Sequence, residues 1–259
     1  MKKKSTSAQA DRWHLVLGGS DGIGFAFAEW LAEHQCRLII VARNKERLSR
    51  ARTKLLASGA AEVRILAGDL LNARFRAGLF RRASTIRLSL IFIGGPSPPA
   101  GTIDQISSNE VEAGAQSCLA YPIDVMRFAL SHHASRKRDP LTIIFLSSSA
   151  SRDDLPDHPF FLSALFRSAA EHLLKRIAEL HLHEPVELLI WRPNVVYTRL
   201  AKAYAATLPL FSPDGSLSDR LRRIFRSPVP SPTEYIQSVT DHLKVHSARR
   251  RQGKGGPRS

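Results

Sequence analysis

Along this chain, short runs of apolar residues alternate with longer stretches in which apolar residues recur every three or four positions. Apolar runs of five or six residues predict buried strands, and longer stretches with apolar residues three or four positions apart predict amphipathic helices between them. The predicted strands are Trp13–Leu17, Arg37–Ala42, Glu62–Ala67, Leu88–Ile93, Leu141–Leu146 and Val186–Trp191. The predicted helices are Gly24–His34, Lys45–Ala57, Asn72–Ala83, Glu112–Ser135 and Leu162–Leu182.

This alternation is typical of an α/β protein. Strands that are separated by helices pair in parallel, and the helices then cover both faces of the sheet. The sequence therefore predicts a Rossmann-type doubly wound parallel sheet in three layers, with six strands. The pattern weakens after Pro193, and a final helix is expected over Ser231–Val245. We expect a basic flexible N-terminus (1–12), one domain (13–246) with a substrate lobe (194–230), and a basic disordered tail (247–259).

Composition and charge narrow the possible functions. The 259 residues carry a formal net charge of +15, which attracts anions in general. No nucleic-acid-binding motif accompanies the charge, so solvated faces and tails are the favoured interpretation and a nucleic-acid role is not expected. The two cysteines lie far apart in the sequence, which favours a reducing compartment and a cytoplasmic location. The longest apolar run, Leu88–Ile93, is too short to span a membrane.

A glycine-rich stretch follows the first predicted strand and opens the first predicted helix. In this context Gly18 allows a tight turn, Gly22 allows close approach of a diphosphate, and Gly24 allows the helix to pack closely on the strand. The helix N-terminus would add free N–H groups and a positive dipole end. The sequence thus predicts a dinucleotide site, and the alternative is a glycine-rich turn without a ligand. Its other expected contacts are Ser20, Asp21 and Ile23.

The residue after the second strand bears on the choice of cofactor. NAD-selective sites usually place Asp or Glu there, whereas this chain has Arg43, which can pair with a 2′-phosphate. NADP(H) is therefore favoured over NAD(H), and a solvated arginine at a strand end is the alternative. Asp69, which precedes Leu70 after the third strand, is expected either to accept a hydrogen bond from the adenine amino group or to cap a helix.

Together with these motifs, the chain from Trp13 to Val245 resembles the short-chain dehydrogenase/reductase family. The family pattern TGxxxGIG appears as Leu17-Gly18 and Gly22-Ile23-Gly24. The glycine loop resembles that of 3-ketoacyl reductases and 17β-hydroxysteroid dehydrogenases, as does Val196–Lys202. The turn Ile93–Pro99 is similar to the Asn-Ala-Gly turn of 3-oxoacyl reductases. The resemblance implies cofactor contacts at Leu70, Gly94 and Thr198, and the family's usual seventh strand is missing from the pattern.

The family's catalytic serine matches Ser148, but its Tyr-x-x-x-Lys pair does not survive. These two positions fall on Ser163 and Arg167, and the family asparagine falls near Cys118. A serine is a far weaker acid than a tyrosine, and an arginine stays protonated and does not relay a proton as lysine does. Arg167 is expected to bind the cofactor ribose or to hold a substrate carboxylate or phosphate. Alternative proton donors are Tyr121, Tyr197, His158 and Asp153-Asp154.

The resemblance implies an NADPH-dependent carbonyl reductase with a non-standard active site. Its substrate would be a small ketone or a carrier-bound 3-oxoacyl group, and family analogy implies a homodimer or homotetramer. One alternative is a catalytically degenerate member that acts as a binding or regulatory protein. Another is an enzyme of altered reaction type, such as a dehydratase or isomerase. The histidine pairs lack partners at metal-ligand spacing, so no metal is expected.

Overall fold

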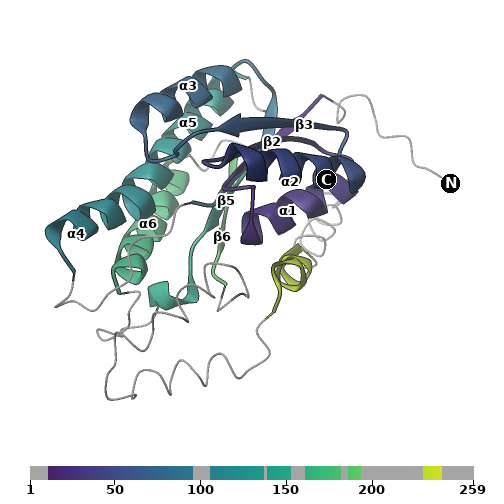
Figure 1. Ribbon diagram of the computed structural model, residues 1–259. Helices are drawn as coiled ribbons and strands as arrows, with labels where there is room; N and C mark the ends of the chain where they lie inside the picture. Colours follow the sequence, from purple (N-terminus) through teal and green to yellow (C-terminus); the bar gives the residue numbers. More distant parts are fainter. Residues whose placement is uncertain are drawn as a thin grey trace, which may run out of the picture.

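The computed structural model describes residues 11–95, 106–136, 139–152, 161–181, 186–193, 196 and 230–240. These residues contain a single parallel sheet whose strand order is β3-β2-β1-β4-β5-β6 (Figure 1). The strands are β1 (Trp13–Leu17), β2 (Arg37–Ala42), β3 (Glu62–Ala67), β4 (Leu88–Ile93), β5 (Leu141–Leu146) and β6 (Val186–Trp191). All six have the bounds that the apolar runs predict, so the predicted α/β sheet is confirmed.

The helices alternate with these strands. They are α1 (Gly22–Glu33), α2 (Lys45–Ala57), α3 (Ala73–Ala83), α4 (Ser108–Ala115), α5 (Tyr121–Ser135) and α6 (Phe161–Leu180). A further helix covers residues 232–240, within the range expected for the last helix. The helix predicted to be continuous over Glu112–Ser135 starts earlier and is interrupted by a π-helical turn at Gln116–Ala120, between α4 and α5.

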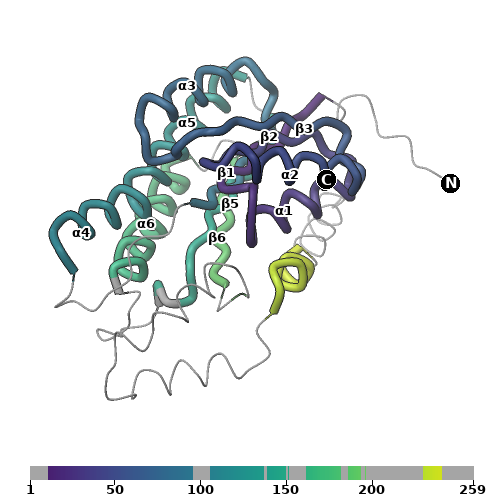
Figure 2. Tube along the Cα trace, viewed as in Figure 1, coloured from purple at the N-terminus to yellow at the C-terminus, as the bar shows by residue number. Residues whose placement is uncertain are grey.

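Two hydrophobic clusters fill the space on either side of the sheet. One joins α3, α5 and α6 to the strands through residues such as Ile93, Phe145 and Leu174. The other joins α1, α2 and the helix at 232–240 to the opposite face, through Phe27 and Phe92 among others. The tube in Figure 2 shows α1 and α2 on one side of the sheet and α3 to α6 on the other. The arrangement therefore has the three layers that the sequence predicts.

The strand order reverses beside β1. The chain runs from β1 outward to β2 and β3, and then returns to place β4 on the other side of β1. In open α/β sheets, ligands bind outside the carboxyl ends of the strands at such a reversal. A ligand site is therefore expected beyond Leu17 and Ile93, where β1 and β4 end. In the described part of the chain the sheet ends at β6, and no seventh strand is present.

Several sequence predictions lie outside the described residues. They include the N-terminal segment before residue 11, most of the lobe at 194–230 and the basic tail. None of the helices in the described ranges combines the length and the apolar character that crossing a bilayer requires.

Candidate active site

The glycine turn after β1 has the backbone geometry that requires glycine. Gly18 has φ +81° and Gly22 has φ +57°, both in the left-handed region that side chains disfavour. A Cβ atom on Gly24 would lie 2.4 Å from the carbonyl oxygen of Gly18. The turn and the first residues of α1 are thus packed too closely for side chains at these positions.

The N-terminus of α1 faces this turn. Asp21 is the N-cap residue, and its Oδ1 accepts a 2.8 Å hydrogen bond from the Gly22 N–H. The helix therefore begins at Gly22, two residues before the start that the sequence predicts. Ser20 is half-buried in the turn, and Ile23 packs against the cluster beneath α1. The N–H groups of the first helical turn and the helix dipole together make this end of α1 suitable for an anion.

Arg43 lies beside the same turn. It follows β2 directly and is exposed, and the Val41 carbonyl two residues before it accepts a 2.9 Å hydrogen bond from the Gly18 N–H. Asn44 caps α2, because its side chain accepts a hydrogen bond from the Arg47 N–H. Arg43 is thus an exposed residue on a backbone segment that neighbours the glycine turn and leads into the capped helix α2.

Asp69 and Leu70 follow β3. Asp69 Oδ1 accepts a 3.0 Å hydrogen bond from the Leu71 N–H, so its side chain caps the turn before α3. The side chain of Leu70 is buried in the core, and its carbonyl accepts a hydrogen bond from Arg76. The helix-capping alternative for Asp69 is wrong, because the N-cap of α3 is Asn72, whose side chain accepts a hydrogen bond from the Phe75 N–H. Only the backbone of Leu70 is suited to face a ligand.

Gly94 connects the ends of β1 and β4. Its N–H donates to the Leu17 carbonyl, and a Cβ atom on Gly18 would lie 3.3 Å from the Gly94 carbonyl carbon. The Tyr121 hydroxyl donates a 2.8 Å hydrogen bond to the Gly94 carbonyl. Burial raises the pKa of Tyr121, which is 1% exposed. This geometry favours a structural role for Tyr121 beneath the turn, not the role of proton donor.

The serine segment after β5 continues alongside the end of β6. The Ser147 N–H donates to the Trp191 carbonyl at 2.7 Å, and the Ser149 N–H donates to the Pro193 carbonyl at 2.9 Å. Ser148 is half-buried between them. A short 3₁₀ turn, Ser149–Arg152, follows at once. Backbone hydrogen bonds therefore fix Ser148 at the carboxyl edge of the sheet, where the family's catalytic serine is expected.

Ser163 and Arg167 lie on one face of α6 and contact each other. The Arg167 Nε donates to the Ser163 Oγ at 3.2 Å, and its Nη1 donates to the Leu146 carbonyl at the end of β5. Leu146 is two residues before Ser148. The structure thus brings Ser163 and Arg167 to the end of the strand that leads into Ser148, although the sequence places them 15 to 19 residues later.

Sequence reasoning missed a buried ion pair beneath this group. Glu171, one helical turn after Arg167, is hydrogen-bonded to Arg192 at the end of β6, with Nε at 2.9 and 2.8 Å from its two carboxylate oxygens. A second contact joins Glu171 to the Arg192 Nη2. The sequence does indicate that Glu171 shares a helix face with Ser163 and Arg167, because the three residues are spaced four positions apart. The partner of Glu171 lies in another element, and no local pattern identifies it.

Other expected residues take no part in the described site. Thr198, Tyr197, His158 and Asp153-Asp154 lie outside the described residues. Cys118 is buried within the π-helical turn. Between residues 11 and 240, the described ranges hold no group of three His, Cys, Asp or Glu side chains that could bind a metal. His132 and His133 are buried, with ring nitrogens bonded to the carbonyls of Ile86 and Asp139.

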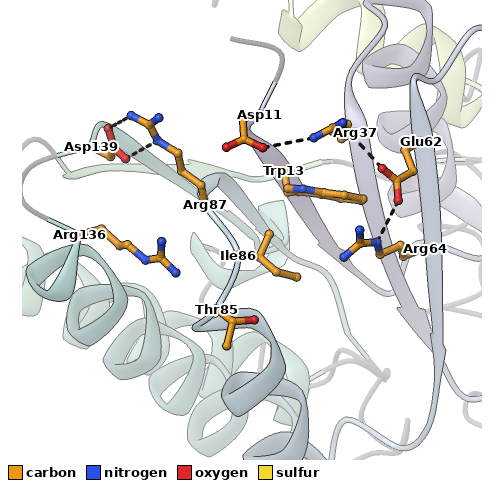
Figure 3. A pocket seen from close by; sticks show the side chains of 10 residues that line it. All are labelled: Asp11, Trp13, Arg37, Glu62, Arg64, Thr85, Ile86, Arg87, Arg136 and Asp139. Carbon is orange, nitrogen blue, oxygen red and sulfur yellow. Dashed lines mark hydrogen bonds and ion pairs between the residues drawn. The ribbon is translucent and has the colours of Figure 1, made fainter. Parts of the chain in front are cut away.

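A separate hollow of about 680 Å³ lies at the opposite end of the sheet. Figure 3 shows its lining, in which Arg87 pairs with Asp139, and Arg37 and Arg64 both contact Glu62. It opens where the strands begin, and most of the charged side chains that line it form ion pairs with one another. It is therefore distant from the glycine turn and is not the candidate active site.

One protein family matches most of this chain. Residues 12–208 match the short chain dehydrogenase family. The chain belongs to this family. Membership supports an oxidoreductase with a nicotinamide cofactor, in agreement with the expected family and with the Rossmann fold.

Curated relatives match parts of the chain. The chain is 32% identical over 124 residues to NADPH-dependent reductase BacG of Bacillus subtilis, which covers 46% of this chain and 48% of the relative. It is 41% identical over 58 residues to 17-beta-hydroxysteroid dehydrogenase type 3 of Danio rerio, covering 22% of this chain and 19% of that protein. It is 36% identical over 70 residues to inactive hydroxysteroid dehydrogenase-like protein 1 of Homo sapiens, covering 27% and 20%. The matches thus span between about a fifth and a half of the relatives' length.

Solved structures share the fold over most of their length. YwfH, an NADPH-dependent reductase involved in bacilysin biosynthesis, superposes with a TM-score of 0.77 at 20% identity, covering 89% of this chain and 90% of that chain. A 3-oxoacyl (acyl-carrier-protein) reductase from Agrobacterium tumefaciens with NADP bound gives a TM-score of 0.74 at 22% identity, covering 89% and 86%. At these identities the likeness establishes the fold.

Proposed function

We propose that this protein is an NADPH-dependent carbonyl reductase. The observation that carries the proposal is the glycine turn at the strand-order reversal, where Gly18, Gly24 and Gly94 leave no room for side chains. These glycines let β1, α1 and β4 pack closely and leave the turn without side chains, so that a dinucleotide diphosphate could approach the backbone N–H groups at the N-terminus of α1. The residues present therefore fit a nicotinamide dinucleotide.

The proposal names NADPH and not NADH because of Arg43. A guanidinium group can hold a 2′-phosphate through two charge-assisted hydrogen bonds, whereas an NAD-selective site needs an acidic side chain for the ribose hydroxyls. The names of the relatives support the choice, since BacG is an NADPH-dependent reductase and the Agrobacterium reductase was solved with NADP. The proposed cofactor contacts are Gly18, Ser20, Asp21, Gly22, Ile23, Gly24, Arg43, Asp69, Leu70, Gly94, Arg167 and Thr198.

When bound, the cofactor would supply a hydride to the carbonyl carbon of the substrate. In our proposal the Ser148 hydroxyl donates a hydrogen bond to the carbonyl oxygen and stabilises the negative charge that develops there. Arg167, held by Leu146 and Ser163, orients the cofactor ribose or an anionic group of the substrate. Neither Ser163 nor Arg167 has the acidity of the family tyrosine, so in our proposal the alkoxide takes its proton from water, from the substrate or from a side chain outside the family pair.

The substrate class follows from the charge at the site. Arg167 forms no ion pair with a carboxylate in the described residues, and Glu171 is engaged by Arg192. A fixed positive charge therefore remains near Ser148, and it favours a ketone that carries a carboxylate, a phosphate or an acidic carrier, such as a 3-oxoacyl thioester. The family resemblance further supports a homodimer or homotetramer through α5 and α6, and the exposed Leu165, Leu173 and Leu180 on α6 are available for it.

A second candidate function is a catalytically degenerate binding protein. Two observations favour it: the family tyrosine and lysine positions hold Ser163 and Arg167, and some relatives carry the name of an inactive dehydrogenase. This protein would still bind NADPH but would reduce nothing. The two candidates therefore share the cofactor site and differ only in turnover.

NADPH absorbance, followed with a panel of neutral ketones, keto acids and 3-oxoacyl thioesters, tests the proposal. We expect oxidation of NADPH with at least one anionic or carrier-bound substrate, and Ser148→Ala should lower turnover by about a hundredfold or more. Ser135→Ala is the control, because Ser135 bonds the His132 carbonyl at the far end of helix α5. NADPH binding without oxidation across the panel would support the binding protein instead.

A further inference from the structure

Glu171 is a buried carboxylate whose contacts join three segments around Ser148. Its side chain is 8% exposed, and that of its partner Arg192 is 17% exposed. Glu171 projects from α6, Arg192 ends β6, and Ser151 lies in the turn after β5. The ion pair joins α6 to the end of β6.

Ser151 connects the carboxylate to the catalytic segment. Its Oγ lies 2.9 Å from Glu171 Oε1 and 2.7 Å from the carbonyl oxygen of Ser148. The Ser151 N–H also donates to the Ser148 carbonyl, at 3.2 Å. The Ser148 backbone is therefore coupled to Glu171 through Ser151, whose one hydroxyl proton is shared between the two acceptors.

Arg192 provides the second connection. The Ser147 and Ser149 N–H groups bond the carbonyls of Trp191 and Pro193, the two neighbours of Arg192 in the chain. When Glu171 holds Arg192, it therefore also holds the backbone to which the serine segment is bonded. Removing one charge of a buried ion pair leaves the other charge uncompensated. A substitution of Glu171 should therefore disturb both the backbone around Arg192 and the serine segment that is bonded to it.

The ionisation state of Glu171 agrees with its contact to Arg192. Burial by itself would raise the pKa of Glu171, but hydrogen bonds from Arg192, Ser147 and Ser151 and the positive charge of Arg192 together outweigh it and lower the pKa. Glu171 is thus ionised and neutralises Arg192. Arg167, one turn earlier on the same helix, contacts Ser163 and Leu146 and has no carboxylate partner among the described residues.

We infer that Glu171 is a positioning residue, which acts on the reaction by holding Ser148 in place through Arg192 and Ser151. This inference rests on the proposed reductase function, because it concerns the geometry of the proposed carbonyl-binding serine. It does not concern the glycine turn, so cofactor binding should be insensitive to Glu171. The effect should fall on kcat and not on the affinity for NADPH.

A control ion pair exists at the other end of the sheet. Arg87 and Asp139 form a two-point ion pair with distances of 2.5 and 2.6 Å, and Figure 3 shows it beside the hollow where the strands begin. Its side chains are 36% and 23% exposed, so it is less buried than the pair of Glu171 with Arg192. Asp139→Asn also breaks an arginine–carboxylate pair, but far from Ser148. It reports what the loss of an ion pair does to the whole protein without any effect on the serine segment.

The experiment compares Glu171→Gln with Asp139→Asn in the full chain. Hydrogen exchange measured by mass spectrometry should be faster by about tenfold or more at the amides of 147–151 in Glu171→Gln, and unchanged there in Asp139→Asn. With a ketone that the unmodified protein reduces, kcat should fall by about tenfold in Glu171→Gln, while the Kd for NADPH stays within about twofold. Ser151→Ala, a milder change, should shift exchange and kcat in the same direction.

Two results would overturn the inference. One is unchanged exchange at 147–151 in both Glu171→Gln and Ser151→Ala. The other is an equal fall of kcat in Glu171→Gln and Asp139→Asn, since that would show a general loss of stability. If no ketone is reduced at all, the proposed function fails, whereas the exchange result still decides whether Glu171 holds the serine segment. If Glu171→Gln does not fold, Ser151→Ala decides.

Discussion

The Nε atom of Arg167 lies 3.2 Å from the Oγ atom of Ser163, on the face of α6 that meets the end of β5. The family resemblance assigns lysine and tyrosine to these two positions. Their contact shows that the helix register places both side chains together beside the serine segment. In our proposal, a fixed positive charge and a weakly acidic hydroxyl therefore replace the acid–base pair that the family resemblance implies at these positions.

Restoring the family pair should therefore raise turnover. In the double variant Ser163→Tyr with Arg167→Lys, a phenol with a pKa near 10 beside an ammonium group replaces a hydroxyl that is a far weaker acid. We expect kcat for ketone reduction to rise by at least about tenfold, measured by NADPH absorbance. Each single variant is a control and should gain less. No gain in the double variant would mean that the proton does not come from this face of α6.

Closing the space at Gly24 should impair cofactor binding. In Gly24→Ala the new Cβ would meet the Gly18 carbonyl oxygen at 2.4 Å, so α1 must move away from the turn. We expect the Kd for NADPH, measured by calorimetry, to rise by about tenfold or more, with about 1–3 kcal/mol of stability lost. Gly78→Ala is the control, because a Cβ there meets nothing within 4 Å. Gly78→Ala should bind NADPH normally, and an equal loss in both variants would argue against the glycine turn.

Removing the charge of Arg43 should reduce the preference for NADPH. Loss of a charge-assisted contact to the 2′-phosphate costs about 2 kcal/mol, which corresponds to about thirtyfold in Kd. Arg43→Ala should therefore weaken NADPH by this factor and leave NADH nearly unchanged, as measured by titration with each cofactor. Arg50→Ala, which removes an exposed arginine from α2, should change neither. Equal weakening of both cofactors in Arg43→Ala would rule out phosphate recognition by this residue.

Local patterns were sufficient to predict the sheet. Each strand is a short apolar run bounded by polar or glycine residues, and all six runs formed strands with the predicted ends. Helix ends were less well predicted. The first helix starts at Gly22 because Asp21 caps it, although a glycine with φ +57° carries no helix signal in the sequence. The π-helical turn at Gln116–Ala120 has no pattern that would distinguish it from the helices on either side.

The site was predictable only as far as its residues follow strand ends or share a helix face. The glycine turn, Arg43 and Ser148 follow strands, and the four-residue spacing joins Ser163 to Arg167. The hydrogen bond of Tyr121 to Gly94 and the pair of Glu171 with Arg192 link residues 21 or more positions apart. Such contacts depend on how elements pack, and no single-element pattern encodes them. The burial of His132 and His133 was missed for the same reason.

His14 should make stability depend on pH. Burial lowers the pKa of His14 in β1 to about 4, from its ordinary value of 6.5, and the nearby charge of Arg12 also lowers it. The folded state therefore holds the neutral ring, whereas the unfolded chain takes up a proton below pH 6.5. The stabilisation is complete above pH 6.5 and is lost as the pH falls toward 4, by about 3 kcal/mol.

Denaturant unfolding at several pH values measures this contribution. Between pH 6.5 and 4 the free energy of unfolding should fall less in His14→Gln than in the unmodified protein. His34→Gln is the control, since His34 is exposed at the end of α1. Parallel pH curves for His14→Gln and the unmodified protein would show that another group is responsible.

Calorimetric titration of the full chain with NADPH and, separately, with NADH tests the dinucleotide site most directly. We predict a measurable heat with one binding site per chain and a lower Kd for NADPH than for NADH. Absence of heat with both cofactors at millimolar concentration would contradict the assignment of the Gly18–Gly24 turn as a dinucleotide site, and with it the proposed reductase.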